Sequence, residues 1–145
     1  MTPLTRLSVC HTQVADLGPL RGLTALDSLL LADTKVVDLG PLKGLTELKR
    51  LHLDYSQVED LSPLNGLIKL YHLDLSGTRV VNLGALDGLT ALEWLGLKST
   101  KVTDLAPVQD LPHLKNIYGA PDAALQRLNA YRAKKGLSAV GTSEY

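Results

Sequence analysis

Residues 23–44 read LTALDSLLLADTKVVDLGPLKG, and the architecture of the chain follows from this pattern. Leu29 and Leu31 are two residues apart, which is the spacing of a short strand with leucines on one face. The segment from Asp38 to Leu42 then turns the chain, because Pro41 fixes φ and suits the first turn of a short helix. The stretch therefore predicts one strand followed by one short helical turn.

The same pattern returns at a step of 22 residues, with a Leu-x-x-Leu opening at 23–26, 45–48, 67–70 and 89–92. Five units follow one another without insertion, at 1–22, 23–44, 45–66, 67–88 and 89–110, and a partial unit occupies 111–120. One unit is too small to bury its own leucines, whereas stacked units bury them as a continuous column. The repeat therefore predicts a solenoid, with its strands side by side in one parallel sheet.

Each unit follows the pattern L-x-x-L-x-L-x-x-T-x-V-x-D-L-x-P-L-x-G-L. This resembles the leucine-rich repeat family, and in particular the 22-residue class typified by bacterial internalins. The resemblance implies an α/β solenoid: a right-handed coil with a parallel sheet on its concave face and short 3-10 or turn segments on its convex face. It covers residues 1 to about 120, and we expect residues 1–145 to form a single domain.

After the last unit, residues 121–136 are predicted to form a capping α-helix. Pro121 and Asp122 are typical of a helix start, and Gly136 of a helix end. The apolar residues recur at helical spacing and predict one face against the repeats, with Arg127 and Arg132 in water. The basic residues around 132–135 are interpreted as a solvated helix end and not as a nucleic-acid patch. Residues 138–145 are small and polar, and we expect a frayed tail.

No comparable cap precedes the first unit, so its strand is expected to be a bare sheet edge. Three interpretations stay open here: the chain is part of a longer protein, it pairs with another chain at this edge, or Arg6 blunts the edge.

Composition excludes several function classes. Lys+Arg and Asp+Glu both number 15, so the formal net charge of +0 argues against nucleic acid or an anionic membrane as the main partner. No apolar run is long enough to span a bilayer, and no signal peptide is visible. The single cysteine fits a reducing compartment. The cytoplasm is therefore slightly favoured, and export through a missing or non-standard signal is the alternative.

Side chains that flank the strand leucines form outward columns on the concave face. From the third unit onward these columns combine aromatic, arginine and charged residues, which protein interfaces favour. We therefore expect a protein-binding patch across the third to sixth strands. It consists of Arg50, His52, Asp54, Tyr55, His72, Asp74, Trp94, Lys98 and Tyr118.

Each feature of this patch has a second interpretation. The Trp94 ring either contacts a partner or packs over Gly96, and Tyr118 fits packing at the cap junction. His52, His72 and Asp74 could form an acid–base or metal constellation, but the open sheet and the missing nucleophile favour an interface or a solvated network.

A further column on the convex side holds mostly aspartate, which either binds calcium or caps the turns, and capping explains it without metal. Its members are Asp16, Asp38, Asp60, Asn82 and Asp104.

These observations predict a non-catalytic protein-interaction scaffold that binds a partner on its concave sheet. No Gly-rich phosphate loop, nucleophile elbow or metal-spaced His/Cys cluster appears, so no enzyme activity, cofactor or metal is implied. The alternative is a structural, assembly or sensor segment of a multidomain protein that acts through the uncapped N-terminal edge. The chain is then a monomer or self-associates through that edge.

Overall fold

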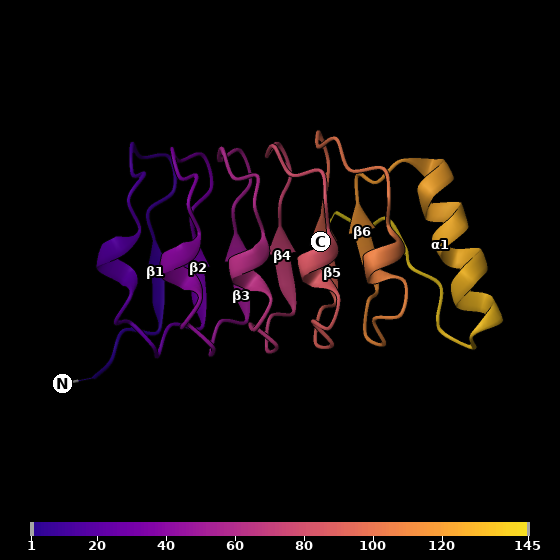
Figure 1. The fold of residues 1–145 in the computed structure, drawn as a ribbon, viewed down its shortest axis with the longest axis horizontal. Helices are drawn as coiled ribbons and strands as arrows, with labels where there is room; N and C mark the ends of the chain where they lie inside the picture. The colour runs from indigo at the N-terminus through magenta and orange to yellow at the C-terminus, as the bar shows by residue number, and fades with distance from the viewer. Residues whose placement is uncertain (1, 145) are drawn as a thin grey trace.

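A computed structural model describes residues 2–144. Met1, which begins the first repeat, and Tyr145, which ends the tail, lie outside the described residues. Figure 1 shows one row of stacked coils with a helix at its C-terminal end. The strands form a single parallel sheet in chain order, β1 to β6. They are β1 (Arg6–Ser8), β2 (Ser28–Leu30), β3 (Arg50–His52), β4 (His72–Asp74), β5 (Trp94–Gly96) and β6 (Asn116–Tyr118).

The opposite side of the coil carries a short 3-10 helix in each of the five complete units. These helices are η1 (Gly18–Leu20), η2 (Gly40–Leu42), η3 (Ser62–Leu64), η4 (Gly84–Leu86) and η5 (Ala106–Val108). Neighbouring 3-10 helices contact one another, as neighbouring strands do. The predicted α/β solenoid is thereby confirmed.

The core is a column of leucines in exact repeat register. The middle residue of each strand pairs with its equivalent in the next strand, as Leu51 does with Leu73 and Leu73 with Leu95. These three side chains are fully buried. Burying one leucine stabilises a fold by about 1.5–3 kcal/mol, so stacking supplies stability that one unit lacks.

Two polar columns stabilise the turns from within each unit. The aspartate column accepts a hydrogen bond from the backbone two residues on, for example from Gly40 N–H to Asp38 Oδ1 at 2.8 Å. The threonine and serine column donates to the carbonyl three residues back, for example from Thr34 Oγ1 to Leu31 O at 2.8 Å. Each side chain of the first column thus accepts a main-chain hydrogen bond at the start of its turn, as the capping interpretation predicts.

The turn after each strand requires a left-handed backbone. Tyr55 has φ +60° and Gly77 has φ +68° at equivalent positions of successive units. Of the glycines that end the units, Gly88 has φ +96°, whereas Gly22, Gly44 and Gly66 do not have positive φ.

The predicted capping helix is confirmed as α1 (Asp122–Lys134). Ala124 and Leu128 are buried against the repeats. The expectation that Arg132 lies in water is wrong, because its side chain is fully buried. Its Nη1 donates to the carbonyls of Gln109 and Leu111 at 3.0 and 2.9 Å, and its Nε donates to the Ser138 carbonyl at 2.7 Å. Arg132 therefore joins the cap, the last repeat and the tail.

The tail is held in place, so the expectation of a frayed tail is wrong for residues 138–144. Val140 is buried and exchanges two hydrogen bonds with the Asn129 amide, at 2.8 and 3.0 Å. Gly141 then bonds to the free edge of β6 on either side of Asn116, donating to Lys115 O at 2.7 Å and accepting from Ile117 N–H at 2.9 Å. The tail thus adds a bridge parallel to β6 and covers the edge that this strand would otherwise expose.

At the other end of the sheet, β1 pairs with β2 and with no other described strand, as expected for a bare edge. Within residues 2–144, no helix is long and apolar enough to cross a membrane.

The role of Arg132 leads to a first prediction. Replacing Arg132 by alanine leaves three carbonyl groups without their donor, and we expect the free energy of unfolding to fall by about 3 kcal/mol. Urea unfolding followed by circular dichroism measures the change. Arg127→Ala, at an exposed position of the same helix, is the control and should stay within about 0.5 kcal/mol of the wild type. Equal effects of the two substitutions would contradict the anchoring role.

Candidate functional site

The centre of the concave face carries a row of four stacked rings that crosses β3 to β6. His52 stacks on His72 with ring centroids 5.0 Å apart, and His72 stacks on Trp94 at 4.4 Å with an interplanar angle of 7°. Trp94 stacks in turn on Tyr118 at 6.3 Å. The row exists because the 22-residue register sets these strands side by side. Each such pair adds about 0.5–1.5 kcal/mol beyond its buried area, so the row stabilises this face.

Trp94 is at the middle of this row and is only 6% exposed. It faces outward, as its position predicts, but its indole Nε1 donates to the Ser143 carbonyl of the tail at 2.9 Å. Gly96 makes room for the ring, since a Cβ at Gly96 would come within 2.8 Å of it. The packing interpretation of Trp94 therefore describes this structure, and the tail is part of that packing.

Burial changes the protonation of the two histidines. His72 is 7% exposed between His52 and Trp94, and burial lowers the pKa of His72 to about 4, with help from the neighbouring His52 and Arg50. Burial also lowers the pKa of His52. Both imidazoles are therefore neutral near pH 7, which lets the rings stack without repulsion.

Two carboxylates lie next to the histidines. Asp74 is buried and accepts a hydrogen bond from the backbone N–H of Ser76 at 3.0 Å. Burial raises the pKa of Asp54, and the charge of Asp74 raises it further. Within the described part of the chain, Asp54 Oδ1 and the Nε2 atoms of His52 and His72 are buried without a hydrogen-bond partner. The face thus holds polar atoms that the fold itself does not satisfy.

One group on this face has the donor types of a metal site. Ligand atoms of His52, Asp54 and Asp74 lie within 4.8 Å of one another. Two atoms bound to one ion lie about 3–3.5 Å apart, because metal–ligand bonds are about 2.0–2.2 Å long, so these residues would have to move closer. The expectation that His52, His72 and Asp74 form an interface or a solvated network stays a prediction.

The remaining patch residues lie around this centre. Tyr55 is 58% exposed and its ring lies against Gly77, where a Cβ would come within 2.4 Å of the ring. Arg50 and Lys98 are exposed, and the Lys98 ammonium lies 5.6 Å from the centroid of the Tyr118 ring. The structure therefore brings all nine predicted residues onto one face, but it buries His72, Asp74 and Trp94 and leaves the others open or half-buried.

Sequence reasoning missed two contributors to this face. The first is the tail around Ser143, whose position depends on the Asn129 contact and has no local sequence signal. The second is the column that precedes each strand, where Lys49 and Tyr71 reach the concave side. The repeat frame places that column, and counting it with the others would have found both residues.

The fold is similar to those of known bacterial proteins. An internalin (InlF) from Listeria monocytogenes is 29% identical with a TM-score of 0.79, over 88% of this chain and 39% of that one. Internalin C2 from the same organism is 31% identical with a TM-score of 0.80, over 87% of this chain and 58% of that one. A leucine-rich repeat protein of Leptospira interrogans, 21% identical with a TM-score of 0.81 over 90% of this chain, shows the fold alone.

This chain spans 39%, 58% and 36% of the length of those three proteins, respectively. No protein-family model matches the sequence. No curated protein matches it either.

The position of the tail leads to a second prediction. Trp94 is the only tryptophan, so its fluorescence reports on this face. Ending the chain after Ser138 removes the Ser143 carbonyl from the indole, and we expect a red-shifted emission and stronger acrylamide quenching. Circular dichroism should show that the repeats remain folded. An unchanged emission maximum in a folded truncated chain would contradict the covering role of the tail.

The pKa of His72 leads to a third prediction. Because the folded pKa of about 4 lies below the ordinary value of 6.5, the unfolded chain binds the proton more readily. The neutral ring stabilises the fold above pH 6.5, and this contribution is lost as the pH falls toward 4. We expect about 2 kcal/mol of loss by pH 5, measured by urea unfolding, and a smaller loss in His72→Phe. An NMR titration in which the His72 imidazole protonates near pH 6.5 would contradict this result.

Proposed function

We propose that this chain, a leucine-rich repeat protein with 22-residue internalin-like repeats, is a non-catalytic module that binds a protein partner on the concave face of its sheet. The leucine-rich repeat solenoid is in general a protein-interaction scaffold, because its outward columns vary without disturbing the core. The internalin neighbours are consistent with such a role. The proposal assigns this role to a particular face.

One observation carries the proposal most directly. Framework side chains such as Thr34 and Asp38 have main-chain partners within their own unit. In contrast, His52 Nε2 and Asp54 Oδ1 are buried on the concave face without a hydrogen-bond partner among the described residues, although Asp54 Oδ1 lies 3.9 Å from His52 Nδ1. A buried polar atom without a partner costs about 1–3 kcal/mol, and a partner protein that supplies donors and acceptors there would recover it. Functional surfaces are where such costs are retained.

The proposed contact surface is the predicted patch, in two parts. Arg50, Tyr55 and Lys98 are exposed and form the part that a partner meets first. His72, Asp74 and Trp94 are buried beneath and support it through the ring row. Tyr118 lies at the covered end of the row, where a partner reaches Trp94 only after displacing the tail.

The second candidate is assembly through the N-terminal edge, and one observation favours it. The tail covers the β6 edge, whereas no described strand or segment pairs with the outer side of β1. Leu7 in β1 is only half-buried, and nearby Leu4 is 46% exposed. A bare strand with apolar residues is a template for pairing with a second chain.

The fourth prediction tests the concave face directly. Immobilised wild-type chain is used to capture partners from bacterial and mammalian lysates, with mass spectrometry to identify them. We expect the double variant Tyr55→Asn, Lys98→Glu to capture at least tenfold less protein than the wild type, because it removes the exposed aromatic ring and reverses the exposed positive charge. Asparagine replaces Tyr55 because it tolerates a φ of +60°.

The control variant carries Ile68→Asn and Lys43→Glu, which change an exposed apolar residue and an exposed lysine away from the sheet. It should capture as much protein as the wild type. Equal loss in both variants would contradict a concave site. A wild-type chain that captures only itself, with a mass in solution that rises with concentration, would favour assembly through β1 instead.

A further inference from the structure

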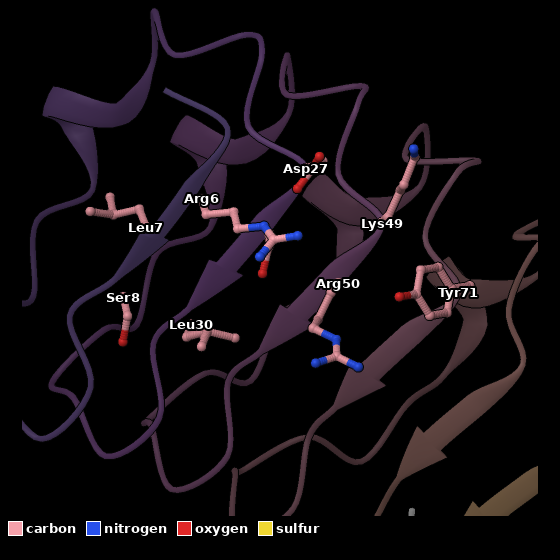
Figure 2. A pocket seen from close by; sticks show the side chains of 9 residues that line it. Arg6, Leu7, Ser8, Asp27, Leu30, Lys49, Arg50 and Tyr71 are labelled. Atoms are coloured by element: carbon pink, nitrogen blue, oxygen red, sulfur yellow. The ribbon is translucent and has the colours of Figure 1, made fainter. Parts of the chain in front are cut away.

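A hollow of about 610 Å³ lies at the N-terminal end of the concave face, across β1 to β3 and up to Tyr71, the residue before β4. Figure 2 shows its side chains, with Arg6 and Arg50 over neighbouring parts of the sheet and Leu30 and Tyr71 beside them. The register explains the hollow, because Arg6, Ser28 and Arg50 are direct neighbours across three strands. The small Ser28 side chain leaves a gap between two long ones.

The hollow is strongly positive although the whole chain has a formal net charge of +0. Its lining contains three cationic side chains, Arg6, Lys49 and Arg50, against the single carboxylate of Asp27, which leaves a formal charge of +2. None of these four side chains takes part in an ion pair within residues 2–144.

The equivalent column elsewhere pairs its charges internally. Two units beyond Lys49, Glu93 forms an ion pair with Lys115 of the next unit at 2.9 Å. Lys49 instead has Asp27 and Tyr71 as its neighbours in this column, and it pairs with neither. The hollow therefore concentrates cationic groups that the fold leaves available to a ligand.

The geometry fits an extended chain. Strands lie about 4.8 Å apart, so the Cα atoms of Arg6 and Arg50 are separated by roughly 10 Å. Alternate side chains of an extended segment are about 6.6–7 Å apart, and the long arginine side chains span the difference. Leu30 and the Tyr71 ring, which is 37% exposed, supply apolar contact between the charged groups.

We propose that this hollow binds an extended acidic segment of a protein, with carboxylates at alternate positions held by Arg6 and Arg50 and supported by Lys49. The inference rests on the proposed function, because it assigns the chemistry of the partner segment on the same concave face. Arginine and carboxylate groups form paired hydrogen bonds of matching geometry, which favours arginine for this role. A chain with a formal net charge of +0 has no overall attraction for the nucleic-acid backbone, and this favours a peptide over nucleic acid as the ligand.

The fifth prediction uses a fluorescein-labelled octapeptide of alternating glutamate and serine, with fluorescence anisotropy as the measurement. We expect the full chain to bind it at least tenfold more tightly than the matching lysine and serine peptide. Binding should weaken as sodium chloride rises from 50 to 300 mM, because salt screens the exposed charges. Equal binding of both peptides would overturn the proposal.

Matched variants separate the hollow from overall charge. Arg6→Glu with Arg50→Glu should weaken binding at least tenfold, and Arg6→Gln with Arg50→Gln should give an intermediate loss. Arg21→Glu with Lys43→Glu makes the same change of charge beside η1 and η2, on the opposite side of the coil, and should leave binding unchanged. Equal weakening by this control variant would overturn the proposal.

Two further outcomes are distinguishable. Tighter binding of a labelled single-stranded DNA 12-mer than of the acidic peptide would assign the hollow to nucleic acid and overturn the proposal. The peptide measurement needs no captured partner, so it tests the hollow even when the capture experiment identifies no partner. Conversely, the chain could fail to bind the peptide and still capture a partner through Tyr55 and Lys98, without a contribution from Arg6 and Arg50. That result would reject the acidic segment as the ligand of the hollow but would support the proposed binding site on the concave face.

Discussion

The buried leucine column constrains everything else in this protein. A three-residue strand such as β4 is too short to be stable alone, and its middle residue Leu73 is buried only because Leu51 and Leu95 lie directly beside it. The units must therefore keep the same length and the same register. Once they do, every outward position becomes one member of a column, and the side chains of distant repeats meet on one face. The ring row from His52 to Tyr118 is a direct product of this constraint.

The two ends of the solenoid differ in how the last coil and the edge strand are covered. At the C-terminal end, α1 covers the last leucines and the tail covers the β6 edge, with Arg132 joining both to the last repeat. At the N-terminal end, β1 pairs only with β2 among the described strands. This difference divides the concave face. Trp94 and its neighbours are covered at one end, whereas the hollow between Arg6 and Arg50 is open at the other.

Charge is distributed along the same axis. Cationic groups gather over β1 to β3, and the carboxylates of Asp54 and Asp74 lie with neutral histidines at the centre. The formal net charge of +0 is therefore a sum over the whole chain, and it does not report how the charges are distributed on the concave face. A protein that offers both signs on one rigid surface discriminates between partners by where their charges lie, and this discrimination does not require high affinity.

The amino-acid pattern alone predicts the repeat length, the strands and turns, the leucine core, the capping helix and the face on which the nine patch residues lie. It could do so because these features depend on local periodicity and on contacts between equivalent positions 22 residues apart. Three features become visible only in the folded chain: Arg132 is buried, the tail returns to β6, and Ser143 covers Trp94. These contacts join residues outside the repeat period, and no pattern in the chain indicates such pairs. They form because the last repeat leaves carbonyl groups and a strand edge without partners, and the cap and tail supply the missing hydrogen bonds.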